Sequence, residues 1–163
     1  MKKWIHVWIL ALLFVGCSLK TEINSSQPYL ISLKNRHMAF SDAGFLNVAD
    51  GYTNMQIFST GALLLNLEVT HNVCLDGKCY DKLAFNRLFF DVEHYEELIN
   101  DLLLMKPIFG GKNRVDIDGG FEQVLTLGDT HIVYRIQKGT LYFKDSKHGI
   151  LMKLKPLEKD KIQ

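Results

Sequence analysis

Short β-type apolar runs separated by turn residues fill most of the chain after residue 36, and they constrain its fold more than any other feature. In the run 62–70 every second residue is aliphatic: Leu63, Leu65, Leu67 and Val69. Because side chains alternate between the two faces of a strand, this run predicts a strand with one wholly aliphatic face. An antiparallel meander is predicted by the runs 121–127, 131–137, 141–144 and 149–154, which are divided by polar or Gly-containing turns.

Shorter runs precede these strands. We expect strands over 37–40, 45–48 and 55–59, and we interpret Asp42-Ala43-Gly44 as the turn between the first two. Thr60-Gly61 forms the turn before the run 62–70. The earlier part of the domain is therefore also predicted to consist of hairpins.

The spacing of apolar residues changes between residues 81 and 105. One short helix is predicted from the apolar positions Leu83, Phe85, Leu88 and Phe89. A second helix, capped by Asp91 and ended by Pro107, is predicted from the stripe Tyr95, Leu98, Ile99, Leu102 and Met105. We therefore predict an α+β fold class, with a curved antiparallel sheet and two helices covering its concave face.

The segment VCLDGKCY, residues 73–80, predicts a tight hairpin closed by a disulfide. Asp76-Gly77 suits a two-residue turn in which both central residues have positive φ. Cys74 and Cys79 then form a non-hydrogen-bonded pair with Cα atoms about 4.5 Å apart, which a disulfide tolerates. A zinc site is disfavoured, because no second cysteine pair accompanies this one.

Residues 1–17 have the pattern of a bacterial targeting signal. Two lysines precede an apolar run that is too short to span a bilayer as a permanent helix. The run ends in Leu13-Phe14-Val15-Gly16-Cys17, which resembles a lipobox. On this interpretation residues 1–16 are a lipoprotein signal peptide, Cys17 carries acyl chains such as palmitate, and Ser18 favours the outer membrane. The alternatives are an ordinary secreted protein and a membrane anchor that contains a cysteine.

The remaining chain is expected to form one domain without enzymatic chemistry. We expect a lipidated Cys and flexible tether over 17–30, the domain over 31–157 and a tail over 158–163. Nucleic acid is disfavoured as a partner, because 19 Lys and Arg residues balance 18 Asp and Glu residues without long blocks of either sign. Histidines are scattered, and no nucleophile elbow or phosphate loop occurs. We therefore expect no catalytic residues, no metal site and no cofactor.

The order of these elements resembles the outer-membrane lipoprotein receptor LolB and, more loosely, the LolA/LolB-like half-barrels. The likeness covers about residues 36–155 and includes MQIFSTGALLLNLEV, VCLDGKCY, LINDLLLMKPIFGG, FEQVLTLGDTHIVYRI and LYFKDSKHGILMKLK. It implies a periplasmic half-barrel whose apolar cavity receives lipoprotein acyl chains from a LolA-like carrier and places them in the outer membrane. The family also has a protruding apolar loop that touches the membrane. The matching turn here, with Thr60 and Gly61 at its tip, is short and lacks a large apolar residue.

Two aliphatic strand faces and the second helix could enclose either an acyl-chain cavity or a filled core. The expected cavity residues are Leu63, Leu65, Leu67, Ile132, Tyr134, Ile136, Tyr95, Leu98, Ile99 and Leu102. The resulting hypothesis is a lipid-anchored outer-membrane lipoprotein that binds acyl chains and helps receive or insert lipoproteins. The alternative is a cell-envelope interaction lipoprotein with a packed core and no lipid-transfer activity.

Overall fold

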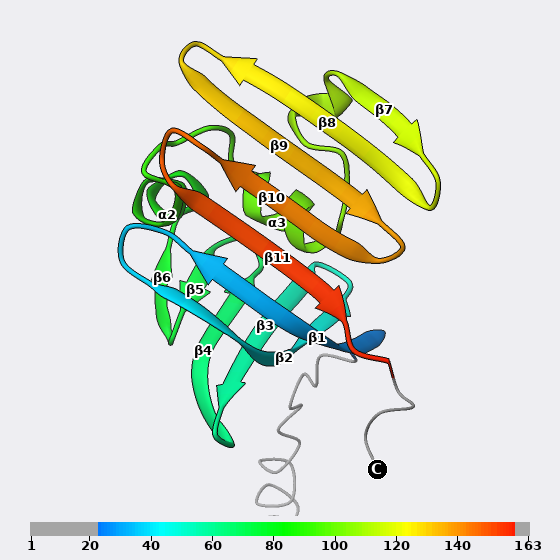
Figure 1. Ribbon diagram of the computed structural model, residues 1–163. Coiled ribbons are helices and arrows are strands. Elements are labelled where there is room, and N and C mark those ends of the chain that lie inside the picture. The colour runs from blue at the N-terminus through cyan, green and yellow to red at the C-terminus, as the bar shows by residue number, and fades with distance from the viewer. Residues whose placement is uncertain (1–22, 159–163) are drawn as a thin grey trace, which may run out of the picture.

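A computed structural model describes residues 23–158, which form one antiparallel sheet of eleven strands (Figure 1). The strands are β1 (Ser25–Lys34), β2 (Ala39–Ala49), β3 (Tyr52–Ser59), β4 (Ala62–Val69), β5 (Val73–Leu75), β6 (Lys78–Tyr80), β7 (Arg114–Ile117), β8 (Gly120–Leu127), β9 (Thr130–Gln137), β10 (Thr140–Asp145) and β11 (Ile150–Pro156). Their order across the sheet is β6-β5-β4-β3-β2-β1-β11-β10-β9-β8-β7. The first and last strands in sequence therefore pair at the middle of the sheet.

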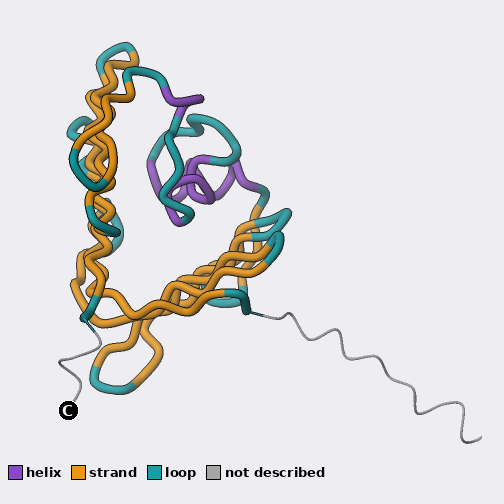
Figure 2. Tube along the Cα trace, turned by 90° about the vertical axis from the view of Figure 1, so that its right-hand side faces the viewer, coloured by secondary structure: helices purple, strands orange, loops and turns teal. Residues whose placement is uncertain are grey.

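The sheet is bent into two limbs, which Figure 2 shows edge-on. We call β2–β6 the N-terminal limb and β7–β11 the C-terminal limb, with β1 joining them. The chain between β6 and β7 holds α2 (Lys82–Phe90), α3 (Leu98–Leu103) and the short 3-10 turn η2 (Phe109–Gly111). This stretch, which we call the helical segment (residues 82–112), lies in the angle between the limbs (Figure 2).

The predicted α+β class, with a half-barrel covered by two helices, is wrong. The described chain is mostly sheet, and helices make up 13% of it. Only one of its described helices has seven or more residues. The second predicted helix is short because its expected first turn is not helical: Asp91 and His94 have φ angles of 60° and 49°. Asp91 follows the last residue of α2 in the left-handed conformation, which ends that helix.

Two strands differ from the sequence-based expectation. β1 begins at Ser25, within the stretch expected to be a tether, because it pairs with β2 from Ser25 onward; from Tyr29 it also pairs with β11. β2 runs without interruption through Asp42-Ala43-Gly44, which is not a turn. A Cβ atom at Gly44 would overlap the main-chain oxygen of Gln56 on β3, so this glycine permits a close approach of two strands.

The hydrophobic core lies on the concave side of the sheet and includes the helical segment. Its most deeply buried large side chains include Tyr134, Phe85, Phe90 and Phe143. Phe90 of α2 packs edge-to-face against Phe143 of β10, with ring centroids 5.9 Å apart. Aromatic pairs of this geometry stabilise by about 1 kcal/mol beyond the area that they bury. The helical segment is thus part of the core and not an appendage to it.

Candidate functional site

Nine of the ten residues predicted to line an acyl-chain cavity come together on the concave side of the sheet. Eight of them are buried: Leu65, Leu67, Ile132, Tyr134, Ile136, Leu98, Ile99 and Leu102. Tyr95 is half-buried and packs against the same cluster. In this conformation the strand side chains and the helix side chains fill the space between them, since most have no exposed surface.

Leu63 does not belong to this group, because the β3–β4 pairing contains an irregularity. Ile57 pairs with Leu65, but the next residue, Phe58, pairs with Leu63, so Leu64 is an extra residue on β4. A bulge of this kind reverses the side on which the following residues point. Leu63 is accordingly 52% exposed, although the strict alternation in sequence places it with Leu65.

The β3–β4 hairpin carries exposed apolar side chains beside its turn. Thr60 and Gly61, with φ angles of 51° and 83°, form the turn, and a hairpin projects from the convex side of the sheet (Figure 2). The apolar side chains near this end are Phe45, Phe58, Leu63 and Leu64, which we call the hairpin patch. Three of them are between 43% and 52% exposed, and the rings of Phe45 and Phe58 meet edge-to-face.

The hairpin patch corrects one expectation from the sequence. The turn 59–62 itself has no large apolar residue, as expected, but Leu63 and Leu64 follow it directly and are exposed. The exposed Leu63 was not predicted, because regular alternation along β4 assigns this residue to the core. Four consecutive apolar residues from Ala62 to Leu65 were the available signal, since a strand with a buried face and a solvated face rarely needs them.

Two side chains on inward positions of the C-terminal limb hold the loop that follows α3. The Gln123 amide of β8 donates to the carbonyls of Ile108 and Lys112 at 2.9 and 2.7 Å, and its oxygen accepts from the Ile108 N–H at 2.8 Å. The Tyr134 hydroxyl of β9 donates to the Lys106 carbonyl at 2.9 Å. Both side chains have no exposed surface, so these hydrogen bonds fix the helical segment to the sheet.

Asparagines hold the other end of the helical segment. Asn35, after β1, donates to the Phe89 carbonyl at 3.2 Å. Asn86 of α2 donates to the carbonyls of Glu93 and Tyr95 at 2.7 and 2.8 Å. Both side chains are buried; Asn35 satisfies a carbonyl in the last turn of α2, and Asn86 binds two carbonyls of the loop between α2 and α3. The sequence signal that was missed for Asn86 is a polar residue within the apolar stretch of α2.

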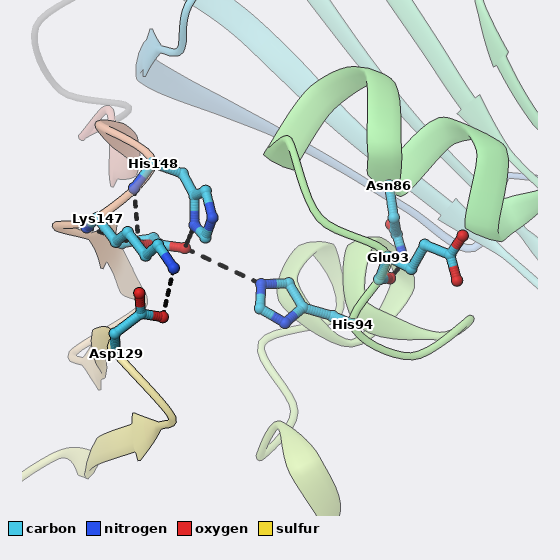
Figure 3. Close-up of polar contacts among 7 residues, drawn as sticks. Asn86, Glu93, His94, Asp129, Lys147 and His148 are labelled. Carbon is cyan, nitrogen blue, oxygen red and sulfur yellow. Dashed lines mark hydrogen bonds and ion pairs between the residues drawn. The ribbon is translucent and has the colours of Figure 1, made fainter.

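A histidine and aspartate cluster joins the helical segment to the β10–β11 turn (Figure 3). Asp145, which is 1% exposed, lies 2.6 Å from His148 Nδ1 and accepts hydrogen bonds from the main-chain N–H groups of Lys147 and His148. His94 Nε2, from the loop between α2 and α3, lies 4.0 Å from the same carboxylate. Lys147 pairs with Asp129 of the neighbouring turn.

Burial sets the protonation of His94. It lowers the pKa of His94, the nearby Asp145 carboxylate raises it, and His148 lowers it further. Since burial is the largest influence, the neutral imidazole is favoured at neutral pH. His94 Nε2 is buried without a hydrogen-bond partner in the described structure, so this nitrogen is where a change of protonation would be felt.

The predicted disulfide between Cys74 and Cys79 is present. The two residues face each other across the β5–β6 pair, their Cα atoms are 3.9 Å apart, and Asp76 and Gly77 both have positive φ. The disulfide crosslinks β5 and β6 at one edge of the sheet. The other cysteine of the sequence, the predicted lipidation site Cys17, lies outside the described residues.

Among residues 23–158, neither α2 nor α3 has the length and hydropathy of a membrane-spanning helix. Within the same residues, no three His, Cys, Asp or Glu side chains are grouped so that they could hold a metal ion. In comparisons with known proteins, the chain matches no family model and no curated protein.

Proposed function

We propose that this chain is an outer-membrane lipoprotein of LolB-like function, which binds acyl chains and helps receive or insert lipoproteins. The observation that carries the proposal is the hairpin patch, because exposed leucine and phenylalanine side chains on a projecting hairpin suit the apolar interior of a membrane. The lipobox-like sequence that ends at Cys17 would keep that hairpin at the membrane surface. The partners are then the membrane, lipoproteins and a periplasmic LolA-like carrier.

Acyl-chain binding requires the helical segment to move outward from the sheet. The concave side is filled in the conformation described above, and the segment is held by hydrogen bonds from Gln123, Tyr134 and Asn35. An entering acyl chain would replace contacts between the helices and the strands with contacts to its own methylenes, each worth about 0.8 kcal/mol. Transfer is driven by differential affinity for acyl chains and needs no covalent step.

A fluorescent fatty-acyl probe tests acyl binding directly. The chain of residues 18–163 keeps every described strand and helix, and we expect it to bind the probe saturably. In the same protein the pair Leu63→Ser and Leu64→Ser should slow release of the bound probe into vesicles by roughly tenfold, because less apolar surface then enters the membrane. The matched control is Val115→Ser with Val124→Ser, which also removes two exposed apolar side chains but from the opposite edge of the sheet.

The lipid anchor is tested separately in the intact chain. Cys17→Ala should abolish incorporation of labelled fatty acid and leave the signal peptide uncleaved. A variant that still incorporates label would exclude Cys17 as the acylated residue and remove the anchor from the proposal.

A packed core favours a second candidate function. Leu67, Leu98 and Ile99 have no exposed surface, as expected for a cell-envelope interaction lipoprotein without lipid-transfer activity. If the wild-type chain binds no acyl probe, this second function replaces the first. The hairpin patch would then be a contact for the membrane or for a partner protein.

A further inference from the structure

Four exposed lysines gather on the convex face of three neighbouring strands. Lys34 on β1, Lys144 on β10, and Lys153 and Lys155 on β11 all occupy outward positions that alternate with core residues. Strand register brings them together, because Leu151 pairs with both Lys34 and Lys144. We call these four residues the lysine face.

The lysine face gathers, on one surface, four basic residues that have no carboxylate partner within the described chain. Seven Lys and Arg side chains of the described chain pair with carboxylates, for example Arg135 with Glu122 and Lys138 with Asp118. Within residues 23–158 none of the four lysines has such a partner. The outward positions of β1, β10 and β11 carry no Asp or Glu, since the one acidic residue of these strands, Asp145, is buried and bonded to His148.

The surface between these lysines is hollowed on both sides of Tyr142. One hollow of about 510 Å³ is lined by Arg135, Gln137, Lys138, Thr140, Tyr142 and Lys153. A second, of about 330 Å³, is lined by Lys34, Tyr142 and Lys144 and also by Asp145, whose carboxylate is bonded to His148. Ammonium, hydroxyl and amide groups line the first hollow without a carboxylate, the one carboxylate of the second is paired with a histidine, and phosphate oxygens accept hydrogen bonds from such donors.

We propose that the lysine face binds the phosphate groups of anionic lipid head groups in the membrane that carries the anchor. Charge complementarity supports this occupant, and so does the reach of the chain. From Cys17 to Ser25 the chain spans at most about 28 Å, and from Tyr29 onward β1 pairs with β11, which carries Lys153 and Lys155. The proposal rests on the membrane attachment proposed above and is independent of acyl-chain binding.

Attraction of this kind has a defined size and salt dependence. A lysine near an anionic membrane surface strengthens binding roughly fivefold, so three lysines together account for roughly 100-fold. Added salt weakens the attraction, because exposed charges are screened within about 10 Å at moderate ionic strength. Insertion of the apolar hairpin patch into the membrane is not weakened by salt. Salt dependence therefore distinguishes binding by the lysine face from binding by the hairpin patch.

The test is vesicle co-sedimentation of the unlipidated chain, residues 18–163. Vesicles of phosphatidylcholine alone are compared with vesicles that also contain phosphatidylglycerol, at low and high salt. The variant carries Lys144→Gln, Lys153→Gln and Lys155→Gln. Its control carries Lys78→Gln, Lys106→Gln and Lys112→Gln, which remove the same charge from lysines that form no ion pair within the described residues.

We expect the wild type and the control to bind phosphatidylglycerol vesicles at low salt, and the lysine-face variant to bind at least roughly tenfold more weakly. Equal binding to both vesicle types, equal loss in both variants, or no loss in the lysine-face variant would each overturn the proposal. Circular dichroism of each variant checks that it is folded. Because neither the anchor nor an acyl probe is used, failure here leaves the lipidation and acyl-binding tests unaffected.

Discussion

The two limbs of the sheet differ in how burial alternates along their strands. In the C-terminal limb, burial alternates strictly along β8, β9, β10 and β11. In the N-terminal limb, Thr53, Asn54 and Met55 of β3 are buried in succession, and β4 begins with three exposed residues before alternation starts. The C-terminal limb therefore has one buried face and one solvent-exposed face, whereas the N-terminal limb buries side chains on both faces.

A row of polar side chains occupies the convex face of the N-terminal limb. Asn47 accepts a hydrogen bond from Ser26 at 2.6 Å and donates to Asn54 at 3.0 Å. Asn54 donates to Asn66 at 2.7 Å, and Asn66 donates to Glu68 at 2.7 Å. Asn47 and Asn54 are each less than a tenth exposed, so the row stabilises this limb only as long as every member keeps its partner.

The difference shows what alternation alone can and cannot predict. Period-two patterning assigns faces correctly where one face meets solvent, as in the C-terminal meander. It fails where a bulge shifts the phase after Leu64, and where a polar side chain is buried because its neighbours across the sheet are also polar.

Leu65→Glu should destabilise the domain by about 4 kcal/mol or more, because it buries an unpaired carboxylate. Leu63→Glu, two positions away, should change stability by no more than about 0.5 kcal/mol, since Leu63 is exposed. Urea unfolding of the two variants measures both effects. Equal destabilisation would mean that the bulge is absent and that β4 alternates regularly.

Asn54→Leu should cost about 2 kcal/mol, because the amide of Asn47 and the side-chain carbonyl of Asn66 each lose a partner. Gln56→Leu is the control: it lies on the same face of β3, and its side chain forms no hydrogen bond within the described residues. The control should stay within about 0.5 kcal/mol of the wild type in the same unfolding assay. If both variants are equally stable, the polar row contributes nothing to the N-terminal limb.

Replacing Cys74 and Cys79 together with serine should cost about 2 kcal/mol, as expected for a crosslink that closes a short loop. The disulfide makes the edge of the N-terminal limb unlike β7 at the other edge. Hydrogen exchange should therefore become faster in β5 and β6 of the variant and remain unchanged in β7. Mass spectrometry that finds two free thiols in protein isolated without reductant would contradict the premise.

The smallest effect concerns the contact between the helical segment and the C-terminal limb. Burial holds the pKa of His94 below its ordinary value of 6.5, so the unfolded chain binds more protons than the folded chain as the pH falls. Stability is then greatest above pH 6.5 and decreases below it. His94→Gln should flatten the decrease in melting temperature between about pH 7.5 and 5.5. An unchanged pH profile would show that His94 does not titrate on unfolding.

Part of the fold could be predicted from the sequence because its signals are local. The Asp76-Gly77 hairpin with its disulfide, the first helix and the C-terminal meander each depend on residues that are close together in the chain. β1 could not be found in this way, because its polar first part, residues 25–28, becomes a strand by pairing with β2, and the rest of β1 pairs with β11 as well. The same holds for Gly44, where a glycine typical of a turn serves a close contact between strands.

The candidate site was predicted less completely than the fold. Nine of the ten expected interior residues meet on the concave side, because periodicity reports which residues are apolar and inward. Periodicity does not predict which hydrogen bonds fix the helical segment to the sheet. Gln123, Asn86 and Asp145 are polar side chains at inward positions, and their partners are backbone groups or a histidine brought near by the fold.

The position of β1 at the middle of the sheet also governs how the domain folds. Most strand pairs join neighbours in sequence, but β1 pairs with β11, so Tyr29 meets Pro156. A pairing of such high contact order is slow, because a long loop has to close before the pairing stabilises anything. The hairpins of both limbs can form while the chain is incomplete, whereas one side of β1 stays unpaired until the last strand arrives. We therefore expect the β1–β11 pair, which includes the strand nearest the proposed anchor, to form after the hairpins of both limbs.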